Sequence, residues 1–230
     1  MKKTNIAFIG ANGRMGMEFA AVAANVSSAE LTLAIIHKTG KTNFKSTHTK
    51  ISPKAFKGIN IIVDFSTPKM TKEVLSFAVT QKIPVLIGTT GHAKEFAGEL
   101  EKASAVIPVM FASNMSIGIA EVKKLVGLLS KNKSFDVHIH ELHHKHKKDK
   151  PSGTAVSLES AVNGKMETPT SSRIGGICGI HTVYFSNEHE LIKIEHTAFS
   201  RKVFAEGALK AALWLAKKKK GLYFFEDIVK

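Results

Sequence analysis

The side chains best suited to acid–base chemistry gather in one short segment of the chain. Five of its eleven histidines lie within nine residues, and lysines are interleaved with them or follow directly. Histidine titrates near neutrality, and lysine can donate a proton to developing negative charge. Asp149 is the only acid in the stretch 142–150. The members of this histidine–lysine loop are His138, His140, His143, His144, Lys145, His146, Lys147, Lys148, Asp149 and Lys150.

The residues alone leave three interpretations of this loop open. His138 and His140 would share one face of a strand, with three more histidines close by, which suggests a metal site. So many ammonium groups would repel a metal ion, however, and we predict no metal here. A solvated surface loop is the second interpretation. The third is an anion site with acid–base capacity.

The residues that follow the loop favour the anion site. In Pro151-Ser152-Gly153-Thr154, either Ser152 or Gly153 can cap the next helix. Backbone N–H groups at the helix start, with the hydroxyls of Ser152 and Thr154, would then be available to a carboxylate. Together with the loop cations they predict a small anionic substrate.

A glycine-rich segment, Gly10 to Gly16, lies between the first expected strand and the first expected helix. Its spacing is G-x-x-G-x-x-G, not the usual G-x-G-x-x-G. Gly10 permits a tight turn, Gly13 lets the backbone approach a pyrophosphate, and Gly16 permits close helix–strand packing. The helix N-terminus then presents free N–H groups to the anion. The segment predicts a dinucleotide site.

The residues after the second expected strand should select the cofactor. An acid there would bind the ribose hydroxyls of NAD. The chain instead has His37-Lys38-Thr39-Gly40-Lys41, without an acid. Basic groups favour the extra phosphate of NADP, although His37 and Lys38 could simply face solvent. We predict that NADPH is preferred to NADH.

The elements that hold these residues follow from the hydrophobic pattern. The first half alternates short apolar strands with helices, which predicts a parallel sheet covered on both faces. After about Ser113 the strands alternate apolar and polar residues, and a hairpin is expected around Asn187 and Glu188, so we predict a second domain. The expected strands are 5–10, 31–36, 59–65, 85–87, 106–110, 135–141, 180–185 and 190–199, and the expected helices are 14–25, 68–81, 92–103, 117–129, 152–163 and 201–216.

Composition and charge exclude several classes of protein. The chain has 230 residues, 43% hydrophobic and 23% charged, so it carries enough apolar mass to fold as a globular protein. Its net charge of +14 raises nucleic acid as a partner. The lysines are scattered, however, and one Trp with two Tyr provides no base-stacking surface. We therefore predict no nucleic-acid partner.

The same survey predicts a cytoplasmic protein. No apolar run reaches the roughly 18 residues of a membrane span, so no membrane partner is expected. The short apolar run near the N-terminus is broken by Gly10 and Asn12, which argues against export. The single cysteine, Cys178, cannot form an internal disulfide, as is usual in a reducing compartment.

Two segments together resemble one enzyme family. GANGRMG near the N-terminus and ELHHKHKKDKPSGTA at 141–155 resemble the dihydrodipicolinate reductases, the 4-hydroxy-tetrahydrodipicolinate reductases of bacterial lysine synthesis. The second string is long and highly specific. Other segments that resemble the family, in the family's order, are Gly88–Gly91, Ala112–Gly118, Arg173–His181 and His196–Ala208.

The resemblance implies a fold and an activity. The fold is α/β, with an N-terminal Rossmann dinucleotide-binding domain at 1–113 plus 205–230, completed by the C-terminal helix. An inserted α+β domain at 114–204, built on a mixed sheet, would bind substrate and form a homotetramer. The activity is NAD(P)H-dependent reduction of a cyclic imine dicarboxylate to tetrahydrodipicolinate, in the diaminopimelate route to lysine.

The resemblance also implies roles for individual residues. His143 matches the catalytic histidine and Lys147 the proton donor, although the sequence does not decide which of the two delivers the proton. His144, Gly153 and Thr154 match substrate ligands. Ser152 and Arg201 are expected to assist, Arg201 by bidentate carboxylate binding unless it holds the interdomain helix. The expected cofactor-binding residues are Gly10, Ala11, Asn12, Gly13, Arg14, Met15, His37, Lys38, Gly88, Thr89, Thr90, Ala112, Ser113, Asn114 and Met115.

The sequence departs from the family pattern in three places. The family often has an aromatic residue where Met115 stands, the acid after the second strand is absent, and residues 40–58 look short.

Two other functions are also considered. One is a nucleotide-sensing or nucleic-acid-binding protein that keeps a Rossmann domain without chemistry. The other is a metal-dependent enzyme that uses the histidine cluster.

Overall fold

The chain folds into two compact units. A computed structural model describes residues 3–37, 40–164 and 166–229. The first unit joins Met1–Met115 to Phe204–Ile228, and the second unit is Ser116–Val203. The chain therefore passes from one unit to the other at 115–116 and again at 203–204.

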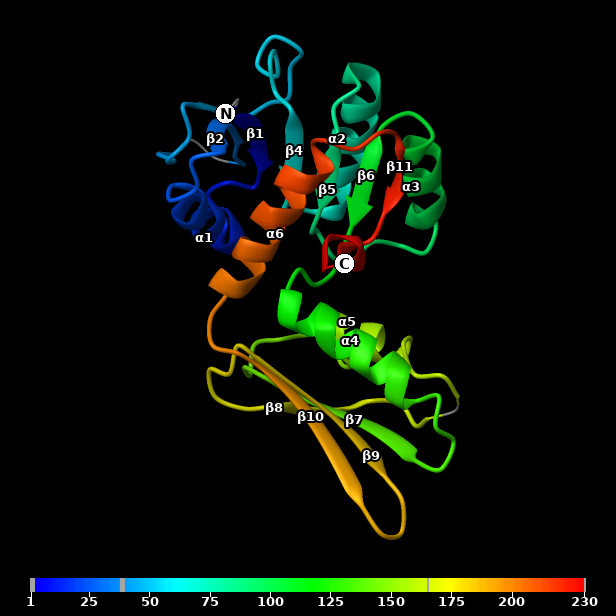
Figure 1. The fold of residues 1–230 in the computed structure, drawn as a ribbon. Helices are drawn as coiled ribbons and strands as arrows, with labels where there is room; N and C mark the ends of the chain where they lie inside the picture. Colours follow the sequence, from blue (N-terminus) through cyan, green and yellow to red (C-terminus); the bar gives the residue numbers. More distant parts are fainter. Residues whose placement is uncertain (1–2, 38–39, 165, 230) are drawn as a thin grey trace. The chain divides into compact units, whose positions relative to one another are not determined.

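The first unit is built on a seven-stranded parallel sheet with helices on both faces (Figure 1). The strand order is β11-β6-β5-β4-β1-β2-β3, and every ladder is parallel. Its elements are β1 (Thr4–Ile9), α1 (Arg14–Ala23), β2 (Ala29–Ile35), β3 (Ser46–His48), β4 (Ile61–Asp64), α2 (Pro68–Gln81), β5 (Val85–Ile87), α3 (Phe96–Ser104), β6 (Pro108–Phe111), α6 (Lys202–Leu215), β11 (Gly221–Tyr223) and a 3-10 helix (Phe225–Val229). The predicted α/β class with a doubly covered parallel sheet is confirmed.

Local chemistry explains where these elements begin. Thr67 is the N-cap of α2 and its hydroxyl accepts a hydrogen bond from the Met70 amide at 3.3 Å, while Pro68 takes the first helical position. All four residues of β4 are buried, as expected for a central parallel strand. Both elements are of the predicted type; α2 has its predicted bounds, and β4 is shorter than the predicted 59–65.

The predicted helix over 92–103 begins four residues later, at Phe96. The imidazole of His92 stacks on the Phe96 ring with centroids 3.8 Å apart, and its Nε2 atom hydrogen-bonds the Thr89 carbonyl at 2.9 Å. Gly91 adopts a φ of 82°, which interrupts a right-handed helix. The segment between β5 and α3 is therefore a loop, which the contacts of His92 hold at the carboxyl end of β5.

The second unit is a mixed four-stranded sheet with two helices. The strand order is β10-β9-β7-β8, in which β7 and β8 are parallel and the other pairs antiparallel. The expected hairpin is present, with Leu191 opposite Ser186. The helices share an apolar core with the sheet, to which Val126, Leu158 and Phe185 contribute. The elements are α4 (Ile117–Leu129), β7 (Asp136–His143), α5 (Gly153–Glu159), β8 (Thr170–Arg173), β9 (Gly179–Ser186) and β10 (Leu191–Ala198).

Three strands were not expected from the sequence, and several helix ends differ from the predicted bounds. The strands β3, β8 and β11 were not expected, and each is three or four residues long at the edge of its sheet. Strands this short carry too few residues for an alternation to be recognised. Helix α5 ends at Glu159, not at Asn163.

Candidate active site

Strand β7 divides the histidines of the loop between two faces of the sheet. Glu141 and His143 are buried, while His138 and His140 lie half-buried on the other face. The rings of His138 and His140 both hydrogen-bond the hydroxyl of Thr170, at 2.9 and 2.8 Å. The expected shared face of His138 and His140 is therefore present, but it is not the face that carries His143.

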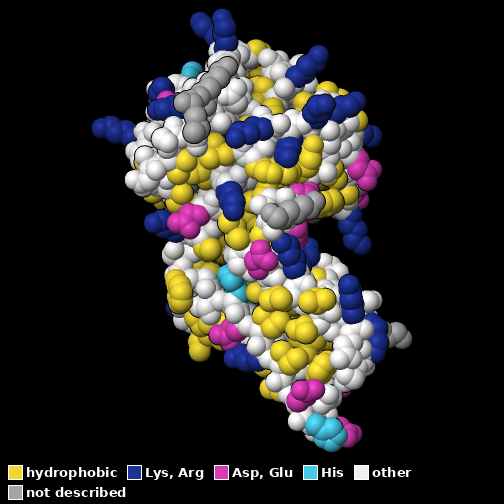
Figure 2. All heavy atoms as spheres, in the orientation of Figure 1, with side chains coloured by type: hydrophobic (Ala, Val, Ile, Leu, Met, Phe, Trp, Pro, Cys, Tyr) yellow, Lys and Arg dark blue, Asp and Glu magenta, His cyan; other side chains and the backbone are white. Residues whose placement is uncertain are grey.

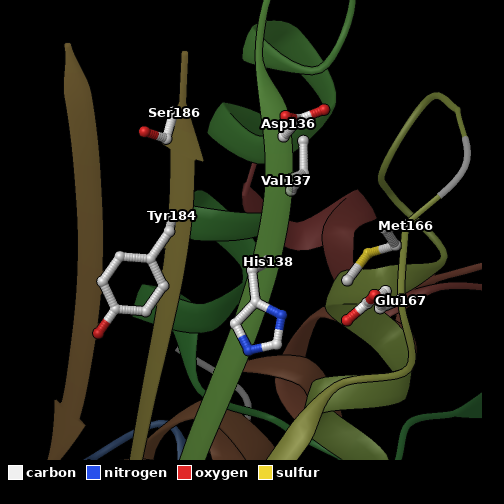
Figure 3. Close-up of a pocket in the computed structure, with 7 residues that line it drawn as sticks. All are labelled: Asp136, Val137, His138, Met166, Glu167, Tyr184 and Ser186. Atoms are coloured by element: carbon white, nitrogen blue, oxygen red, sulfur yellow. The ribbon is translucent and has the colours of Figure 1, made fainter. Parts of the chain in front are cut away.

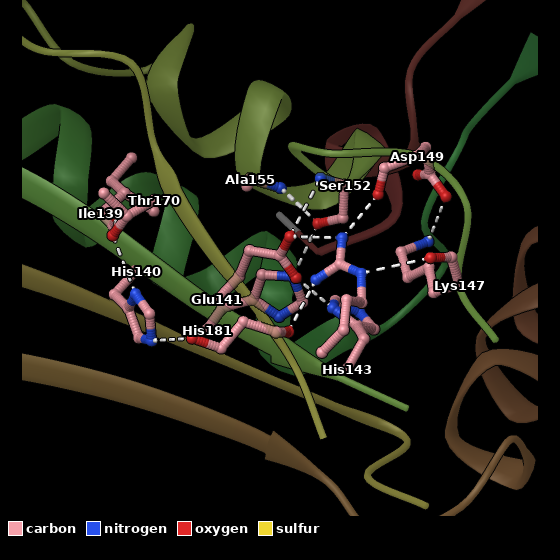
Figure 4. Close-up of polar contacts among 12 residues, drawn as sticks. Ile139, His140, Glu141, His143, Lys147, Asp149, Ser152, Ala155, Thr170 and His181 are labelled. Atoms are coloured by element: carbon pink, nitrogen blue, oxygen red, sulfur yellow. Dashed lines mark hydrogen bonds and ion pairs between the residues drawn. The ribbon is translucent and has the colours of Figure 1, made fainter. Parts of the chain in front are cut away.

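The carboxylate of Glu141 is the centre of a buried polar network (Figure 4). Glu141 is fully buried. Its Oε2 atom accepts a hydrogen bond from Nδ1 of His143. Its Oε1 atom accepts from Nη2 of Arg173 at 2.8 Å and from the Ser152 amide at 3.3 Å. One carboxylate thus fixes a ring, a guanidinium and the start of α5.

The charges of this network set the form of His143. Burial alone would raise the pKa of Glu141, but hydrogen bonds led by that of Arg173 lower it to about 2. Burial also holds the pKa of His143 below its ordinary 6.5, despite the bond to Glu141. A carboxylate only accepts hydrogen bonds, so the neutral ring carries its proton on Nδ1 and a lone pair on Nε2. A Cβ added at Gly179 would lie 2.9 Å from that Nε2 atom, so the missing side chain leaves room there.

Arg173 ties the histidine–lysine loop to the sheet. Its Nε atom donates to the carbonyl of Lys147 at 3.3 Å, and its Nη2 atom donates to the carbonyl of Asp149 at 2.5 Å. In the register of β7 and β8, His143 lies opposite Arg173. The backbone that carries Lys147 is therefore fixed by the same guanidinium that pairs with Glu141.

Lys147 lies beside the network and keeps part of its side chain in solvent. Its Nζ atom forms an ion pair with Oδ1 of Asp149 at 3.0 Å, and its amide donates to the His144 carbonyl at 3.1 Å. Burial would raise the pKa of Asp149, but the bond from Lys147 lowers it below its ordinary value. The loop thus brings an ammonium group to the edge of the site that holds His143.

Ser152 is one of the two residues predicted to cap the helix after the loop. It caps α5, because its Oγ atom accepts from the Ala155 amide at 3.2 Å, and the same atom lies 3.1 Å from Nε2 of His181. Burial first, and then His143, lower the pKa of His181 to about 3, so this ring is neutral. The Ser152 hydroxyl is almost fully buried and has two partners inside the protein.

The other predicted substrate residues lie in different settings. Gly153 is exposed at the first position of α5, and Thr154 beside it is buried. His144 is half-buried and its amide donates to the Ile177 carbonyl at 2.7 Å. Arg201 is half-buried directly before α6 and makes no ion pair with any residue that the structure describes.

The network has the composition of a metal site, but most of its ligand atoms already have hydrogen-bond partners. Donor atoms of Glu141, His143 and His181 lie within 4.8 Å of one another. Both oxygens of Glu141 already accept hydrogen bonds, and Nε2 of His181 is bonded to Ser152. A cation placed there would also face Arg173. The geometry fits a hydrogen-bonded positioning network better than a metal centre.

A separate hollow in the second unit does not suit an anion (Figure 3). It has a volume of about 690 Å³ and opens on the strand face that carries His138. Two carboxylates line it, and both would repel a dicarboxylate. The lining residues are Asp136, Val137, His138, Met166, Glu167, Tyr184 and Ser186.

In the first unit, the glycine segment forms a turn that only glycine allows. Gly10 has a φ of 83°, and a Cβ there would lie 2.6 Å from the Phe65 carbonyl oxygen. A Cβ at Gly16 would lie 2.3 Å from the Ala11 carbonyl oxygen, so α1 packs closely on the turn. Gly13 is the N-cap of α1 and, within the described chain, no side chain caps this helix. Backbone N–H groups are thus left for a pyrophosphate, and the turn fits a dinucleotide.

The remaining predicted cofactor residues follow the carboxyl ends of the parallel strands. Thr89 follows β5, and Ala112 follows β6 with its amide bonded to the Ile87 carbonyl at 3.0 Å. His37 is exposed after β2, and Lys38 lies outside the described residues. Met115 is buried. The other members of the predicted set are positioned as follows: Asn12 and Arg14 exposed, Met15 half-buried, Gly88 against Phe65, and Thr90, Ser113 and Asn114 in the loops after β5 and β6.

Comparison with known proteins decides the family. Sequence patterns of "Dihydrodipicolinate reductase, N-terminus" match residues 4–115, and those of "Dihydrodipicolinate reductase, C-terminus" match residues 117–229. The chain belongs to the dihydrodipicolinate reductase family. The predicted resemblance is thereby confirmed along almost the whole chain.

Individual dihydrodipicolinate reductases support this membership. The chain is 37% identical over 233 residues to a 4-hydroxy-tetrahydrodipicolinate reductase of Bdellovibrio bacteriovorus, covering 100% of this chain and 97% of that one. It is 47% identical over 171 residues to that of Thermosipho africanus, covering 74% and 78%. The predicted function, 4-hydroxy-tetrahydrodipicolinate reductase, and the oxidoreductase class are confirmed.

Solved structures share the fold. A dipicolinate-bound dihydrodipicolinate reductase from Paenisporosarcina sp. TG-14 superposes with a TM-score of 0.81 at 22% identity, covering 98% of this chain and 99% of that one. A myo-inositol 2-dehydrogenase from Lactobacillus plantarum superposes with a TM-score of 0.69 at 12% identity, covering 100% and 94%. The two units thus have the architecture of a reductase with a Rossmann-like domain and a separate mixed sheet.

On the face shown in Figure 2, Lys and Arg side chains are scattered and Asp and Glu lie among them. No single basic stripe follows one element on that face. In the part of the chain that the structure describes, no helix is long and apolar enough to cross a membrane.

Three site residues of this reductase were not found from the sequence: Glu141, Arg173 and His181. Glu141 occupies an inward position of an alternating strand, and a buried carboxylate requires partners. That pattern could have found it. Arg173 and His181 stand in the segment RIGGICGIH but reach the site only through the pairing of β7 with β8 and β9.

Proposed function

We propose that this reductase reduces its cyclic imine dicarboxylate with His143 and Lys147 as the catalytic residues and NADPH as the preferred cofactor. When bound, the nicotinamide dinucleotide supplies the hydride. The observation that carries the proposal is the network in which Glu141 holds a neutral His143 next to the loop of Lys147.

Lys147 is proposed as the proton donor. Hydride addition to a conjugated imine leaves an enamine-like anion, and a nearby proton donor lowers the barrier to forming it. The neutral ring of His143 offers only a lone pair at Nε2. It can orient a substrate N–H or O–H group but has no proton to give from that atom. The ammonium of Lys147, released from Asp149, has protons to donate.

The substrate carboxylates are proposed to bind at the start of α5 and the cations around it. Gly153 presents an exposed backbone, and Thr154 adds a hydroxyl beside it. His144 and Arg201 supply further donors. The Paenisporosarcina relative is described as bound to dipicolinate, a dicarboxylate, which supports this substrate class.

The NADPH preference rests on the carboxyl end of β2. A hollow of about 350 Å³ lies there, lined by Ile36, Gly40, Thr47, His48 and Thr49. None of these described lining residues is acidic, and the exposed His37 precedes the hollow. An extra phosphate would meet hydroxyls and an imidazole, whereas NADH would lack the acid that binds ribose hydroxyls.

A coupled assay tests the reaction and the cofactor together. Substrate would be generated from pyruvate and aspartate semialdehyde by the preceding synthase, and oxidation of NADPH and NADH would be followed in parallel. We expect substrate-dependent oxidation that is faster with NADPH, and a reduced NADPH preference in His37→Asp. Faster oxidation with NADH, or unchanged selectivity in the variant, would contradict the cofactor proposal. No oxidation by folded protein would contradict the reaction itself.

Assembly and compartment complete the proposal. We propose a homotetramer built through the mixed sheet, to be checked by sedimentation velocity. We also propose a cytoplasmic location, consistent with the lone free thiol of Cys178. A monomer at assay concentration would contradict the assembly.

A further inference from the structure

A second buried carboxylate, Asp64, ends the central strand β4. It is fully buried, and it makes no ion pair with any described residue. Strands β1 and β5 flank it, with Ile9 and Ile87 opposite. Burial raises the pKa of Asp64 above its ordinary value, although the hydroxyls around it act in the opposite direction. Burying an acid without a cationic partner costs folding free energy, so we looked for a role that this side chain has in the structure.

The contacts of Asp64 divide into two sets. On one side, Oδ1 accepts from the Ser66 amide at 3.0 Å and from the Ser66 hydroxyl at 2.5 Å. On the other side, Oδ2 accepts from the hydroxyl of Thr71, on helix α2, at 2.5 Å. The first set fixes a loop, and the second fixes a helix.

The loop that Asp64 fixes lies between two segments expected to bind the dinucleotide. The Ser66 amide also bonds Oγ1 of Thr89 at 2.8 Å, and the backbone carbonyl of Asp64 accepts from the Gly88 amide at 2.8 Å. Phe65 fills the space beside the glycines: a Cβ at Gly10 would lie 2.6 Å from its carbonyl oxygen, and one at Gly88 would lie 2.3 Å from its ring. The position of residues 65–66 therefore determines where the turns at Gly10 and Gly88 can lie.

We infer that Asp64 is a positioning residue of the dinucleotide site, which holds Ser66, and through it Thr89, in the conformation that receives the cofactor. The inference rests on the proposed cofactor role of the Gly10 and Thr89 segments. What matters is the acceptor oxygen toward Ser66, not the bond to Thr71. A side chain that keeps an acceptor at that place should keep the site.

The substitution Asp64→Ala tests this inference, because two of the groups that donate to Asp64 keep another hydrogen-bond acceptor. The Ser66 amide keeps its bond to Thr89, and the Thr71 hydroxyl keeps a bond to the Thr67 carbonyl at 3.1 Å. We expect the Kd for NADPH, measured by calorimetry, to rise by about tenfold, which corresponds to about 1.4 kcal/mol. Asp64→Asn retains an acceptor oxygen and should restore the Kd to within about threefold of wild type.

The matched control is Thr71→Val, which removes the bond on the helix side of the same carboxylate. It should lower the melting temperature and leave the Kd for NADPH unchanged. Equal weakening in Thr71→Val and Asp64→Ala would overturn the inference, because the acid would then act only through stability. So would an unchanged Kd in Asp64→Ala.

NADPH binding by a second variant and by the wild-type protein completes the test. If Asp64→Ala cannot be purified folded, Ser66→Ala removes the 2.5 Å hydroxyl bond from a half-buried position. A raised Kd at unchanged melting temperature would then support the inference, and an unchanged Kd would overturn it. Failure of the wild-type protein to bind NADPH would instead refute the proposed cofactor site.

Discussion

The substitution Glu141→Gln separates the positioning role of this carboxylate from its contribution to folding. Glutamine has nearly the same shape but no charge. Arg173 would lose its ion pair but would still donate to the carbonyls of Lys147, Ser172 and Asp149. The variant should therefore fold, and both its stability and its turnover can be measured.

The effect on stability follows from the pKa of Glu141. That pKa falls from an ordinary 4.5 to about 2 in the folded protein. At about 1.4 kcal/mol per pH unit, the ionised group then contributes on the order of 3 kcal/mol to folding. Because the folded-state pKa is the lower one, this contribution is complete above pH 4.5 and disappears as the pH falls toward 2. Wild type should lose stability across this interval, and the variant should lose less.

The effect on turnover follows from the hydrogen bond to His143. Without the carboxylate, neither the ring orientation nor the proton on Nδ1 is fixed. A hydrogen bond to a charged group contributes about 1.5–3 kcal/mol, so kcat/KM should fall about 10- to 100-fold. Glu195→Gln is the matched control, because Glu195 on β10 is exposed to solvent; it pairs with Lys193 and accepts a hydrogen bond from the Thr182 hydroxyl at 3.2 Å. The coupled assay and urea unfolding between pH 3 and 7 provide the two readouts.

Two results would refute this reasoning. The first is a kcat/KM within about twofold of wild type, since a positioning bond must appear in the rate. The second is a loss of stability in Glu141→Gln that does not depend on pH, since only an ionising group produces the acid dependence. A similar effect in Glu195→Gln would point to net charge, not to the network.

Further substitutions test the catalytic pair and the packing of the first unit. His143→Ala and Lys147→Ala should each lower turnover strongly while the fold stays intact; near-normal turnover in both would contradict their catalytic assignment. Gly207→Ala should destabilise the protein by about 2 kcal/mol or more, because its Cβ would lie 1.7 Å from the Met115 carbonyl oxygen. Gly98→Ala, with open space around it in the exposed face of α3, should instead stabilise it by about 0.5–1 kcal/mol. Thermal unfolding of both glycine variants distinguishes crowding from a general effect of alanine.

Much of the fold could be predicted because local patterns fixed its central elements. Thr67 and Pro68 mark the start of α2, and an apolar run marks β4. The edge strands could not be predicted in this way. β8 reads TSSR, and only its pairing with β7 makes it a strand. Such strands depend on a neighbour distant in sequence, which a local pattern does not contain.

The same distinction between local pattern and long-range pairing applies to the candidate site. His143, Lys147 and Ser152 stand in one contiguous string, so residue type and spacing could indicate them. The bond of Ser152 to His181 could not be anticipated, because β9 brings that ring to the site from a separate segment. The Ser152 hydroxyl therefore has a partner that the sequence did not predict.

The two buried carboxylates share a pattern that a sequence does show. Asp64 ends an apolar run, and Glu141 stands between buried positions of an alternating strand. Both are therefore acids at strand positions whose side chains are buried. An unpaired charge there would be expensive, and each position must therefore gather donors around it. Those donors are Ser66 and Thr71 in one case and Arg173 and the Ser152 amide in the other. Because each set of donors carries a loop, the cost of burying the acid is offset by bonds that also fix the geometry of a site. An inward-facing acid in a strand is thus a reason to look for the loop it holds.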